Sequence, residues 1–409
     1  MGFKNAILVG VYEHDSVDAQ ESIEELAFLS KTARLSVKDK ILQRKQELDP
    51  AYYIGQGKLH EIFSLIKQYD IDVVIFDNEL KPLQVRNLEK RLECPVIDRT
   101  ELILEIFALR ARTKQAKLQV ESAKLKYTLP RLRGLWTHLT RIEGGIGTRG
   151  GEGEKQIELD KRMIKRKIQT IDKKLKDVEK IFDTERKGRE DCYKVSLVGY
   201  TNTGKSTLLN KMAGAHVFAE NKLFATLDPT TKRVDLGNNN FFLLTDTVGF
   251  IKKLPHHLVA SFHATLAEIL YADLILHIID ASHPKYKEQI TVVEDTLKQI
   301  GHKEKNIVQV FNKIDLVENK KDFNGLKVSA LTGEGVDKLK LYINSLIISN
   351  KHRIELEVDA GNGKLLAYIR AHTNIIDEEL RGNTYVFSVF ATEREIEDMK
   401  QLKIKNYKL

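Results

Sequence analysis

The stretch Gly199-Tyr-Thr-Asn-Thr-Gly204-Lys205-Ser206 decides the fold of this chain, because it is a complete GxxxxGK[ST] phosphate-binding loop. It follows the apolar run KVSLV, which is typical of a buried strand, and leads into Thr207-Leu-Leu-Asn, which suits a helix. In that setting backbone N–H groups converge on phosphates at a helix N-terminus, where the helix dipole favours anions. We expect Lys205 to reach the β- and γ-phosphates and the Ser206 hydroxyl to bind Mg²⁺. The predicted nucleotide-binding residues of this loop are Gly199, Tyr200, Thr201, Asn202, Thr203, Gly204, Lys205, Ser206 and Thr207.

Strand-like runs recur around the loop at 194–198, 241–245, 274–280, 306–311 and 326–328. Helix-length segments separate them. This alternation predicts an α/β domain with a doubly wound, mostly parallel sheet.

A second motif, Asn312-Lys313-Ile314-Asp315, ends the run IVQVF. The Asp315 carboxylate can accept hydrogen bonds from the ring N–H and the exocyclic amine of guanine, whereas adenine has no such pair of donors on that edge. Ser329-Ala330 follows another strand and places backbone N–H groups near the base. Because ligands bind at the carboxyl ends of the strands in such sheets, these motifs together predict a GTP-binding domain.

A third motif, Asp246-Thr247-Val248-Gly249, ends the run FFLLT. Its aspartate can hold Mg²⁺ through water, and the Gly249 amide can bond to the γ-phosphate. The next residue is Phe250, where GTPases of the Ras type have a glutamine that orients the attacking water. Phenylalanine cannot hydrogen-bond to water, so we expect slow intrinsic hydrolysis that other groups or a partner must assist.

The segment LFATLDPTT, residues 223–231, lies between the phosphate loop and this third motif. A threonine from a segment in this place completes the Mg²⁺ shell when the γ-phosphate is present. Thr226, Thr230 and Thr231 all meet that requirement, and their spacing does not choose among them.

Charge is concentrated in one part of the 409-residue chain. The whole chain has 66 Lys and Arg against 58 Asp and Glu, a net +8, but residues 110–190 alone have 23 against 12, a net +11. Such a segment attracts polyanions such as nucleic acid, although a solvated helical face has the same composition. The two cysteines, Cys94 and Cys192, form no pair or metal motif, and no apolar run is long enough to cross a bilayer, so we expect a soluble, cytoplasmic protein.

Residues 1–100 alternate strand and helix patterns and predict a small N-terminal α/β domain. Residues 101–190 contain two heptad-like stretches around a loop, 143–153, that is rich in glycine. We predict a basic, antiparallel coiled-coil hairpin with this loop at its tip; a disordered linker is the alternative. Residues 191–350 form the predicted GTPase domain, and 351–409 a small α+β domain with no recognisable chemistry.

These motifs together resemble the HflX family of ribosome-associated GTPases, which is similar to the Obg group. The resemblance rests on YIGQGK, RLRGLW, GGIGTRGGEGEKQIELDKR, GYTNTGKST, LFATLDPTT, DTVGFI, NKID and SALTGEG. It spans residues 1 to roughly 350.

The resemblance implies that Thr226 is the Mg²⁺-binding threonine, with catalytic roles for Lys205, Thr226 and Gly249. It also implies that the segment around Thr226 lines the nucleotide and that a hydrophobic residue is normal at Phe250. The implied lining residues are Phe224, Ala225, Thr226, Leu227 and Asp228.

The implied function is binding to the large ribosomal subunit and, in the GTP-bound state, splitting of stalled or idle 70S ribosomes, especially under stress. Family members that hydrolyse ATP make Gly55-Gln-Gly57-Lys58 a faint candidate for a second nucleotide site. The alternatives are an rRNA-remodelling or assembly factor and a signalling GTPase whose hairpin binds protein. We expect a monomer. The candidate rRNA contacts are Arg131, Arg133, Trp136, Arg141 and Arg149, with Trp136 either stacked on a base or packed inside the hairpin.

Overall fold

The computed structural model describes residues 4–132, 151–187, 192–214, 223–224, 226–237, 240–253, 268–302, 306–319, 323–402 and 406–408. The chain divides into two compact units. Unit 1 comprises residues 1–187 together with 220–228 and 248–266, and unit 2 comprises 188–219, 229–247 and 267–409.

Unit 1 begins with a four-stranded parallel sheet of order β2-β1-β3-β4. The central strands are short apolar runs whose residues are almost completely buried, as parallel strands covered on both faces require. The elements of this part are β1 (Asn5–Tyr12), α1 (Ser16–Thr32), β2 (Ser36–Arg44), α2 (Gln56–Tyr69), β3 (Val73–Phe76), α3 (Pro82–Leu92), β4 (Val96–Asp98) and α4 (Arg99–Arg110).

The heptad-like stretch that starts at Leu102 forms two helices rather than one. Helix α4 ends at Arg110, and α5 (Lys114–Thr128) begins after Thr113, whose side chain accepts a hydrogen bond from the Ala116 N–H at 3.1 Å. This N-cap sets the break, because a threonine there satisfies a backbone donor that a helix leaves without a partner at its start. A short 3-10 turn, η1 (Leu129–Arg131), follows α5.

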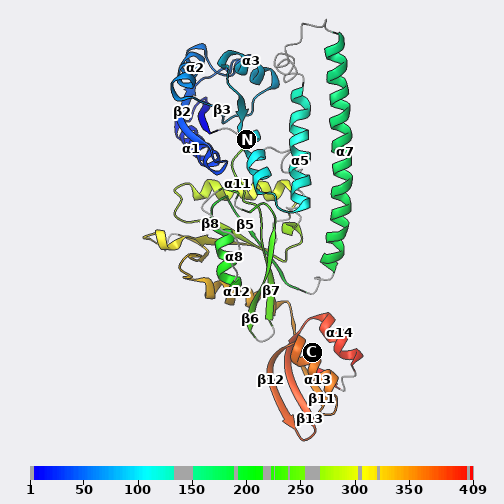
Figure 1. Ribbon diagram of the computed structural model, residues 1–409. Helices are drawn as coiled ribbons and strands as arrows, with labels where there is room; N and C mark the ends of the chain where they lie inside the picture. Colours follow the sequence, from blue (N-terminus) through cyan, green and yellow to red (C-terminus); the bar gives the residue numbers. More distant parts are fainter. Residues whose placement is uncertain are drawn as a thin grey trace. The chain divides into compact units, whose positions relative to one another are not determined.

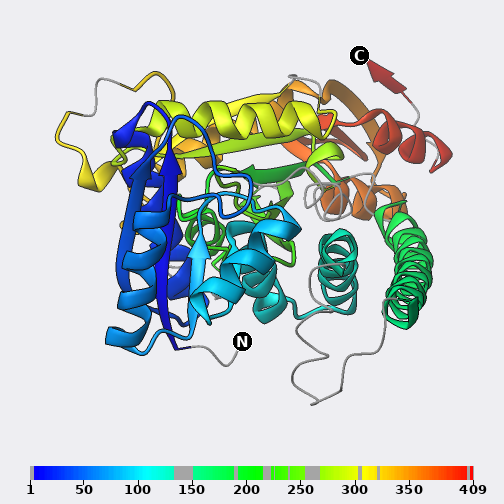
Figure 2. The same cartoon turned by 90° about the horizontal axis from the view of Figure 1, so that it is seen from above.

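Helix α7 (Gly151–Lys187) is the longest element and lies beside α5 (Figures 1 and 2). Polar contacts join the two helices: Ser122 Oγ donates to Asp172 Oδ1 at 3.0 Å, and Lys167 pairs with Glu121 at 2.7 Å. Ile171 is buried, which agrees with an apolar seam along this face of α7.

Glu101, in the first turn of α4, has an environment that opposes its charge. Burial, followed by the charges of Asp98 and Glu105, raises the pKa of Glu101 to about 7, and Arg131 only partly opposes this. A carboxyl group with a raised pKa in the folded state stabilises the fold below its unfolded pKa of 4.5, and that stability is lost as the pH rises toward 7.

We therefore predict that Glu101→Gln raises the free energy of unfolding at pH 8 by about 1–3 kcal/mol and changes it little at pH 4. Urea unfolding of both proteins at the two pH values measures this. An equal difference at pH 4 and pH 8 would contradict the prediction.

Unit 2 is built on a six-stranded sheet of order β10-β9-β8-β5-β7-β6. All neighbours are parallel except β6, which pairs antiparallel with β7. The predicted α/β domain with a mostly parallel sheet is therefore confirmed. Its elements are β5 (Lys194–Val198), α8 (Lys205–Ala213), β6 (Thr230–Gly237), β7 (Asn240–Asp246), β8 (Leu274–Asp280), α11 (Tyr286–Gln299), β9 (Ile307–Asn312), η2 (Ile314–Leu316), β10 (Leu326–Lys327) and α12 (Val336–Ser349).

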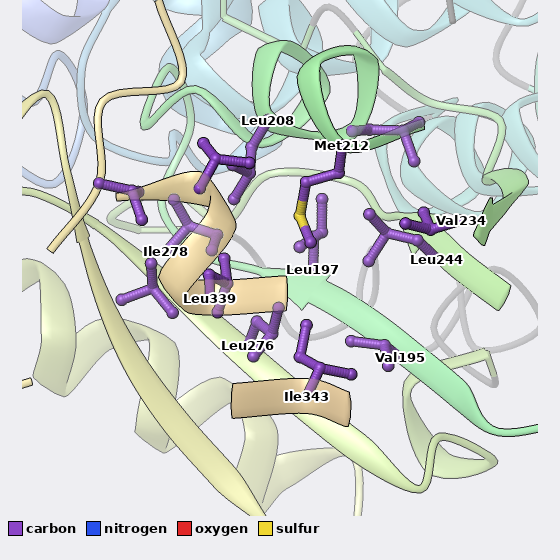
Figure 3. Close-up of a cluster of buried hydrophobic side chains, with 14 of the residues drawn as sticks. Val195, Leu197, Leu208, Met212, Val234, Leu244, Leu276, Ile278, Leu339 and Ile343 are labelled. Carbon is purple, nitrogen blue, oxygen red and sulfur yellow. The ribbon is translucent and has the colours of Figure 1, made fainter. Parts of the chain in front are cut away.

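The core of this sheet brings strands and helices together. Leu197 and Leu276 from the strands pack with Leu208 and Met212 of α8 and with Leu339 of α12 (Figure 3). Leu197, Leu208 and Leu339 have no exposed surface at all. Packing of this kind holds the carboxyl ends of the strands and the start of α8 in a fixed arrangement.

The last part of unit 2 is a four-stranded antiparallel sheet of order β12-β13-β11-β14 with two helices. Its own apolar core includes Leu356, Ile369, Phe387 and Met399. The elements are β11 (His352–Asp359), α13 (Gly363–His372), β12 (Asn374–Arg381), β13 (Thr384–Ala391), α14 (Glu393–Gln401) and β14 (Asn406–Lys408). Among the helices that the structure describes, none is long and apolar enough to span a membrane.

Candidate nucleotide site

The phosphate-binding loop connects β5 to α8 in unit 2. At two of its glycines, neighbouring atoms leave no room for a side chain. A Cβ on Gly204, which has φ +92°, would lie 2.3 Å from Asn312 Nδ2. A Cβ on Gly199 would lie 2.3 Å from the carbonyl oxygen of Ile278 on β8. The loop backbone therefore packs closely against β8 and the end of β9, which only glycine permits at these two positions.

Lys205 is the first residue of α8, and only 6% of it is exposed. Its Nζ donates hydrogen bonds to the carbonyl oxygens of Gly199 at 3.0 Å and Tyr200 at 2.8 Å. Burial lowers the pKa of Lys205 to about 8, against the opposing effect of Asp246. Such a desolvated ammonium group at a helix N-terminus is suited to phosphate oxygens, which would favour its charged form.

Two oxygen donors suited to Mg²⁺ meet beside Lys205. Ser206 Oγ donates to Asp246 Oδ2 at 2.6 Å, and Asp246 is fully buried at the carboxyl end of β7. Thr247 is fixed next to it, because its Oγ1 donates to the Leu197 carbonyl at 2.7 Å. A hydroxyl group and a carboxylate are ligands that Mg²⁺ prefers, so this pair fits the predicted metal.

Asn312 links three motifs of the site. Its Nδ2 donates to the Thr203 carbonyl in the phosphate loop at 2.7 Å, and its Oδ1 accepts from the Ala330 N–H at 2.9 Å. Ser329 is fully buried, and its Oγ accepts from the Thr332 N–H at 3.1 Å. The Asn312 side chain therefore orders the backbone of the phosphate loop and of the segment after β10.

Asp315 is exposed on η2, three residues after this buried asparagine. The buried Ile314 anchors the turn, and its N–H donates to the Val328 carbonyl at 3.2 Å. This leaves the Asp315 carboxylate able to accept hydrogen bonds from a ligand at the carboxyl ends of β9 and β10.

The remaining predicted site residues belong to unit 1. Thr226 and Leu227 lie in the segment 220–228, and Val248, Gly249 and Phe250 in 248–266. Phe250 is 2% exposed and packed as a core residue. Ala225 lies outside the described residues. The predicted Mg²⁺ and catalytic residues are thus divided between the two units.

Both segments make definite contacts within unit 1. The Asp228 carboxylate accepts from the backbone N–H groups of Arg112 at 2.9 Å and Thr113 at 3.3 Å, and from the Thr113 hydroxyl. Phe224 packs edge-on against Phe107, with ring centroids 4.8 Å apart. Asp228, predicted to line the nucleotide, therefore has its carboxylate engaged at the start of α5.

The segment after Phe250 is held by ion pairs. Lys252 pairs with Asp18 at 3.1 Å, and Lys253, at φ +57°, pairs with Asp77. Asp77 is also bonded to Arg99, which is 2% exposed, at 2.7 Å. Burial raises the pKa of Asp77, but Arg99 and Lys253 outweigh it and hold that pKa below its ordinary value. Loss of either partner would leave the buried Asp77 charge incompletely paired, which is costly, so this network favours the observed position of the segment.

Arg131 is the one candidate rRNA contact among the described residues, and its side chain is 14% exposed. Its guanidinium lies 3.6 Å from the ring centroid of Tyr127 and donates to the Leu80 carbonyl at 3.1 Å. It also pairs with Asp98 and Glu79. This arginine holds α5 to the N-terminal sheet. The other four candidates, Arg133, Trp136, Arg141 and Arg149, lie outside the described residues.

The stretch from Gly55 to Lys58 forms the start of α2. The Gly55 N–H donates to Gln43 Oε1 at 3.0 Å, and Lys58 pairs with Glu61 at 2.7 Å. Its lysine therefore stabilises the first turns of a helix, which is an ordinary structural role.

His277 is a residue of this region that the motifs did not indicate. It lies on β8 with 1% of its surface exposed, and burial followed by the charge of Lys205 lowers its pKa to about 4. The imidazole is therefore neutral at physiological pH, so it adds no second positive charge beside the ammonium group of Lys205.

Three family models match consecutive parts of the chain. They are described as GTP-binding GTPase N-terminal, over residues 20–108, GTP-binding GTPase Middle Region, over 110–189, and 50S ribosome-binding GTPase, over 194–313.

Curated relatives match most of the chain. A protein named GTPase HflX from Lacrimispora saccharolytica is 42% identical over 384 residues, which are 92% of this chain and 90% of the relative. GTPase HflX of Escherichia coli is 44% identical over 350 residues, 82% of this chain and 81% of that one. A solved structure of a GTP-binding protein from Sulfolobus solfataricus in complex with GDP is 26% identical and covers 84% of this chain and 98% of that one, with a TM-score of 0.46.

Proposed function

This chain belongs to the HflX family of GTPases, and from that premise we propose that in its GTP-bound state it binds the large ribosomal subunit and splits stalled or idle 70S ribosomes. The observation that carries the proposal is a helix with an exposed basic face, α7, in the same chain as a complete GTPase loop. The exposed cations of this face are Arg162, Lys165, Arg166, Lys167, Lys173, Lys174, Lys176 and Lys180.

The residues of unit 2 support GTP binding directly. Lys205 would neutralise the phosphate oxygens, while the loop backbone at the start of α8 donates hydrogen bonds to them. Ser206 and Asp246 would hold Mg²⁺, which supplies charge neutralisation between the phosphates when bound. Thr226 and Gly249 are proposed to complete the site when the γ-phosphate is present.

Phe250 supports a slow intrinsic reaction. It stands where a water-orienting glutamine would be expected, and its ring is 2% exposed. Since a phenylalanine side chain has no group that hydrogen-bonds to water, it cannot orient the attacking water, and we propose that the ribosome stimulates hydrolysis. A GTPase that depends on its partner in this way hydrolyses GTP slowly alone and rapidly only after it has engaged that partner.

The basic face of α7 supports rRNA as the binding partner, because its exposed lysines and arginines can neutralise rRNA phosphates. Lys167 already pairs with Glu121 of α5, so its neighbours Lys165 and Arg166 are the better candidates for these contacts. Arg133, Trp136, Arg141 and Arg149 are proposed to add contacts from the segment that joins α5 to α7. An rRNA-remodelling or assembly factor would use the same cations on immature subunits, and that is the second candidate function.

Sucrose-gradient sedimentation of purified 70S ribosomes tests the proposal. With a non-hydrolysable GTP analogue we expect separated subunits, with the protein on the large one; with GDP we expect intact 70S particles. Lys165→Ala with Arg166→Ala should reduce splitting, whereas Lys287→Ala with Lys338→Ala, on exposed positions of α11 and α12, serves as the matched control.

The salt dependence of the binding affinity distinguishes an rRNA partner from a protein partner. Removing one cation that binds an rRNA phosphate should reduce the slope of log affinity against log salt by about 1, whereas binding through an apolar protein interface would depend little on salt. Intact 70S particles with the protein at the top of the gradient would contradict the splitting function. Binding to immature large subunits alone would favour the second candidate.

A further inference from the structure

Asp280, the last residue of β8, belongs to none of the nucleotide-binding motifs but contacts one of them. Its Oδ2 accepts a hydrogen bond from Lys313 Nζ at 2.6 Å. The side chain of Asp280 is 13% exposed and that of Lys313 is 27% exposed. This is a close, partly buried ion pair between residues 33 positions apart in the sequence.

The aspartate is itself held in place. Its other oxygen, Oδ1, accepts from Ser282 Oγ at 2.6 Å and from the Ser282 N–H at 3.1 Å. Asp280 is also the register partner of Asn312, and the Ala281 N–H donates to the Asn312 carbonyl at 2.9 Å. The carboxylate therefore has a fixed position beside the start of the second motif.

The backbone of Lys313 adds to this constraint. Its φ is +61°, in the left-handed region that residues with side chains adopt rarely. Asn312 before it is fixed by two hydrogen bonds, and Ile314 after it is buried. The Lys313 side chain is thus constrained at both ends, by the fixed backbone at its Cα and by Asp280 at its Nζ.

We propose that Asp280 is a positioning residue for guanine-nucleotide binding, which holds the Lys313 side chain at the end of the sheet where the base binds. This inference rests on the proposed role of Asp315 at the edge of the base. A purine bound by one edge also needs contact with its ring face, and a lysine side chain can supply it through its methylenes and its cation. Because a long side chain loses rotamer entropy when it is fixed, a lysine already held by Asp280 loses less on binding.

Titration with GDP and with inosine diphosphate, monitored by calorimetry, measures this role. Asp280→Asn should weaken both nucleotides about tenfold, the size expected for loss of one charge-assisted hydrogen bond. Both are affected equally, because the ring-face contact does not read the exocyclic amine. In steady-state hydrolysis, KM should rise by a similar factor while kcat stays unchanged. Asp280→Glu should restore most of the affinity, and Ser282→Ala, which removes one of the two hydrogen bonds to Asp280 Oδ1 and keeps the backbone N–H, should weaken binding by a smaller factor than Asp280→Asn.

A double-mutant cycle with Lys313→Met decides whether Asp280 acts through the lysine. If it does, Asp280→Asn weakens binding by no more than about twofold in the Lys313→Met background. A full tenfold weakening in that background, or wild-type affinity in Asp280→Asn, would overturn the inference. If instead the proposed role of Asp315 at the base is wrong, Asp315→Asn will keep its preference for guanine in the same assay. This result distinguishes that failure from failure of the Asp280 inference.

Discussion

Lys205→Ala should weaken the binding of both GTP and GDP by about 100-fold or more, since a buried phosphate without the cation that neutralises it costs about 3 kcal/mol or more. The lysine is 6% exposed, and its ammonium group donates to the backbone carbonyls of Gly199 and Tyr200. Phosphate oxygens would add negative charge to that of the nearby Asp246 and stabilise the ammonium group further. Fluorescent-nucleotide titration of the two proteins measures the weakening.

The matched control is Lys211→Ala, because Lys211 is an exposed lysine on the same helix, α8. It should bind nucleotide like the wild type. If both variants bind nucleotide equally weakly, the loss of any positive charge on α8 is enough to weaken binding, and the specific role assigned to Lys205 is wrong.

The pH profile gives a second readout of the same residue. Burial lowers the pKa of Lys205 to about 8, and bound phosphate favours the charged form, so above pH 8 binding must take up a proton. The affinity of the wild type for GDP should therefore fall between pH 8 and pH 10. Lys205→Ala should lack this component, so the difference between the two profiles isolates the lysine from the titration of the nucleotide itself.

The sequence predicted the central strands of unit 2 well because their patterns have one dominant physical cause. Strands β5 and β8 are buried on both faces and therefore consist mostly of apolar residues, and the phosphate-binding loop directly follows β5. Close packing at Gly199 and Gly204 explains why the glycines of the loop are a reliable signal.

The edge strands β2, β6 and β12 are not predicted from the sequence, for the converse reason. Strand β2, with the sequence SVKDKILQR, has one neighbour and mostly exposed or half-buried residues, and β6 and β12 are similar. Charged residues on an edge strand prevent pairing with other chains, and they also remove the apolar pattern that would identify it.

Contacts between distant segments could not be predicted from local patterns. Arg131 was expected at rRNA because it is basic, but its partners Tyr127, Leu80 and Asp98 are known only once α5 lies against the N-terminal sheet. The pairs of Lys253 with Asp77 and of Lys313 with Asp280 have the same origin. Spacing predicts which residues share a strand end, but it does not show which charges will pair across the fold.

Asp315→Asn should change which base the site prefers. A carboxylate at this position can accept two hydrogen bonds from guanine, whereas an asparagine amide offers one donor group and one acceptor, which suits the carbonyl and ring N–H of xanthine. We expect GDP binding to weaken about 100-fold or more, because asparagine can accept only one of the two guanine hydrogen bonds and its own N–H group would face the other donor, and we expect binding of xanthosine diphosphate to strengthen.

This prediction separates the base from the phosphates. Asp315 is exposed on η2, so its substitution leaves the packing around Ile314 and Asn312 intact, and phosphate binding through Lys205 should persist. The variant should therefore hydrolyse xanthosine triphosphate, whereas Lys205→Ala should lose both nucleotides. Asp295→Asn, an exposed position on α11, is the matched control and should keep the guanine preference. If Asp315→Asn also keeps that preference, another residue reads the base, and the specificity for GTP must be assigned elsewhere on the carboxyl edge of the sheet.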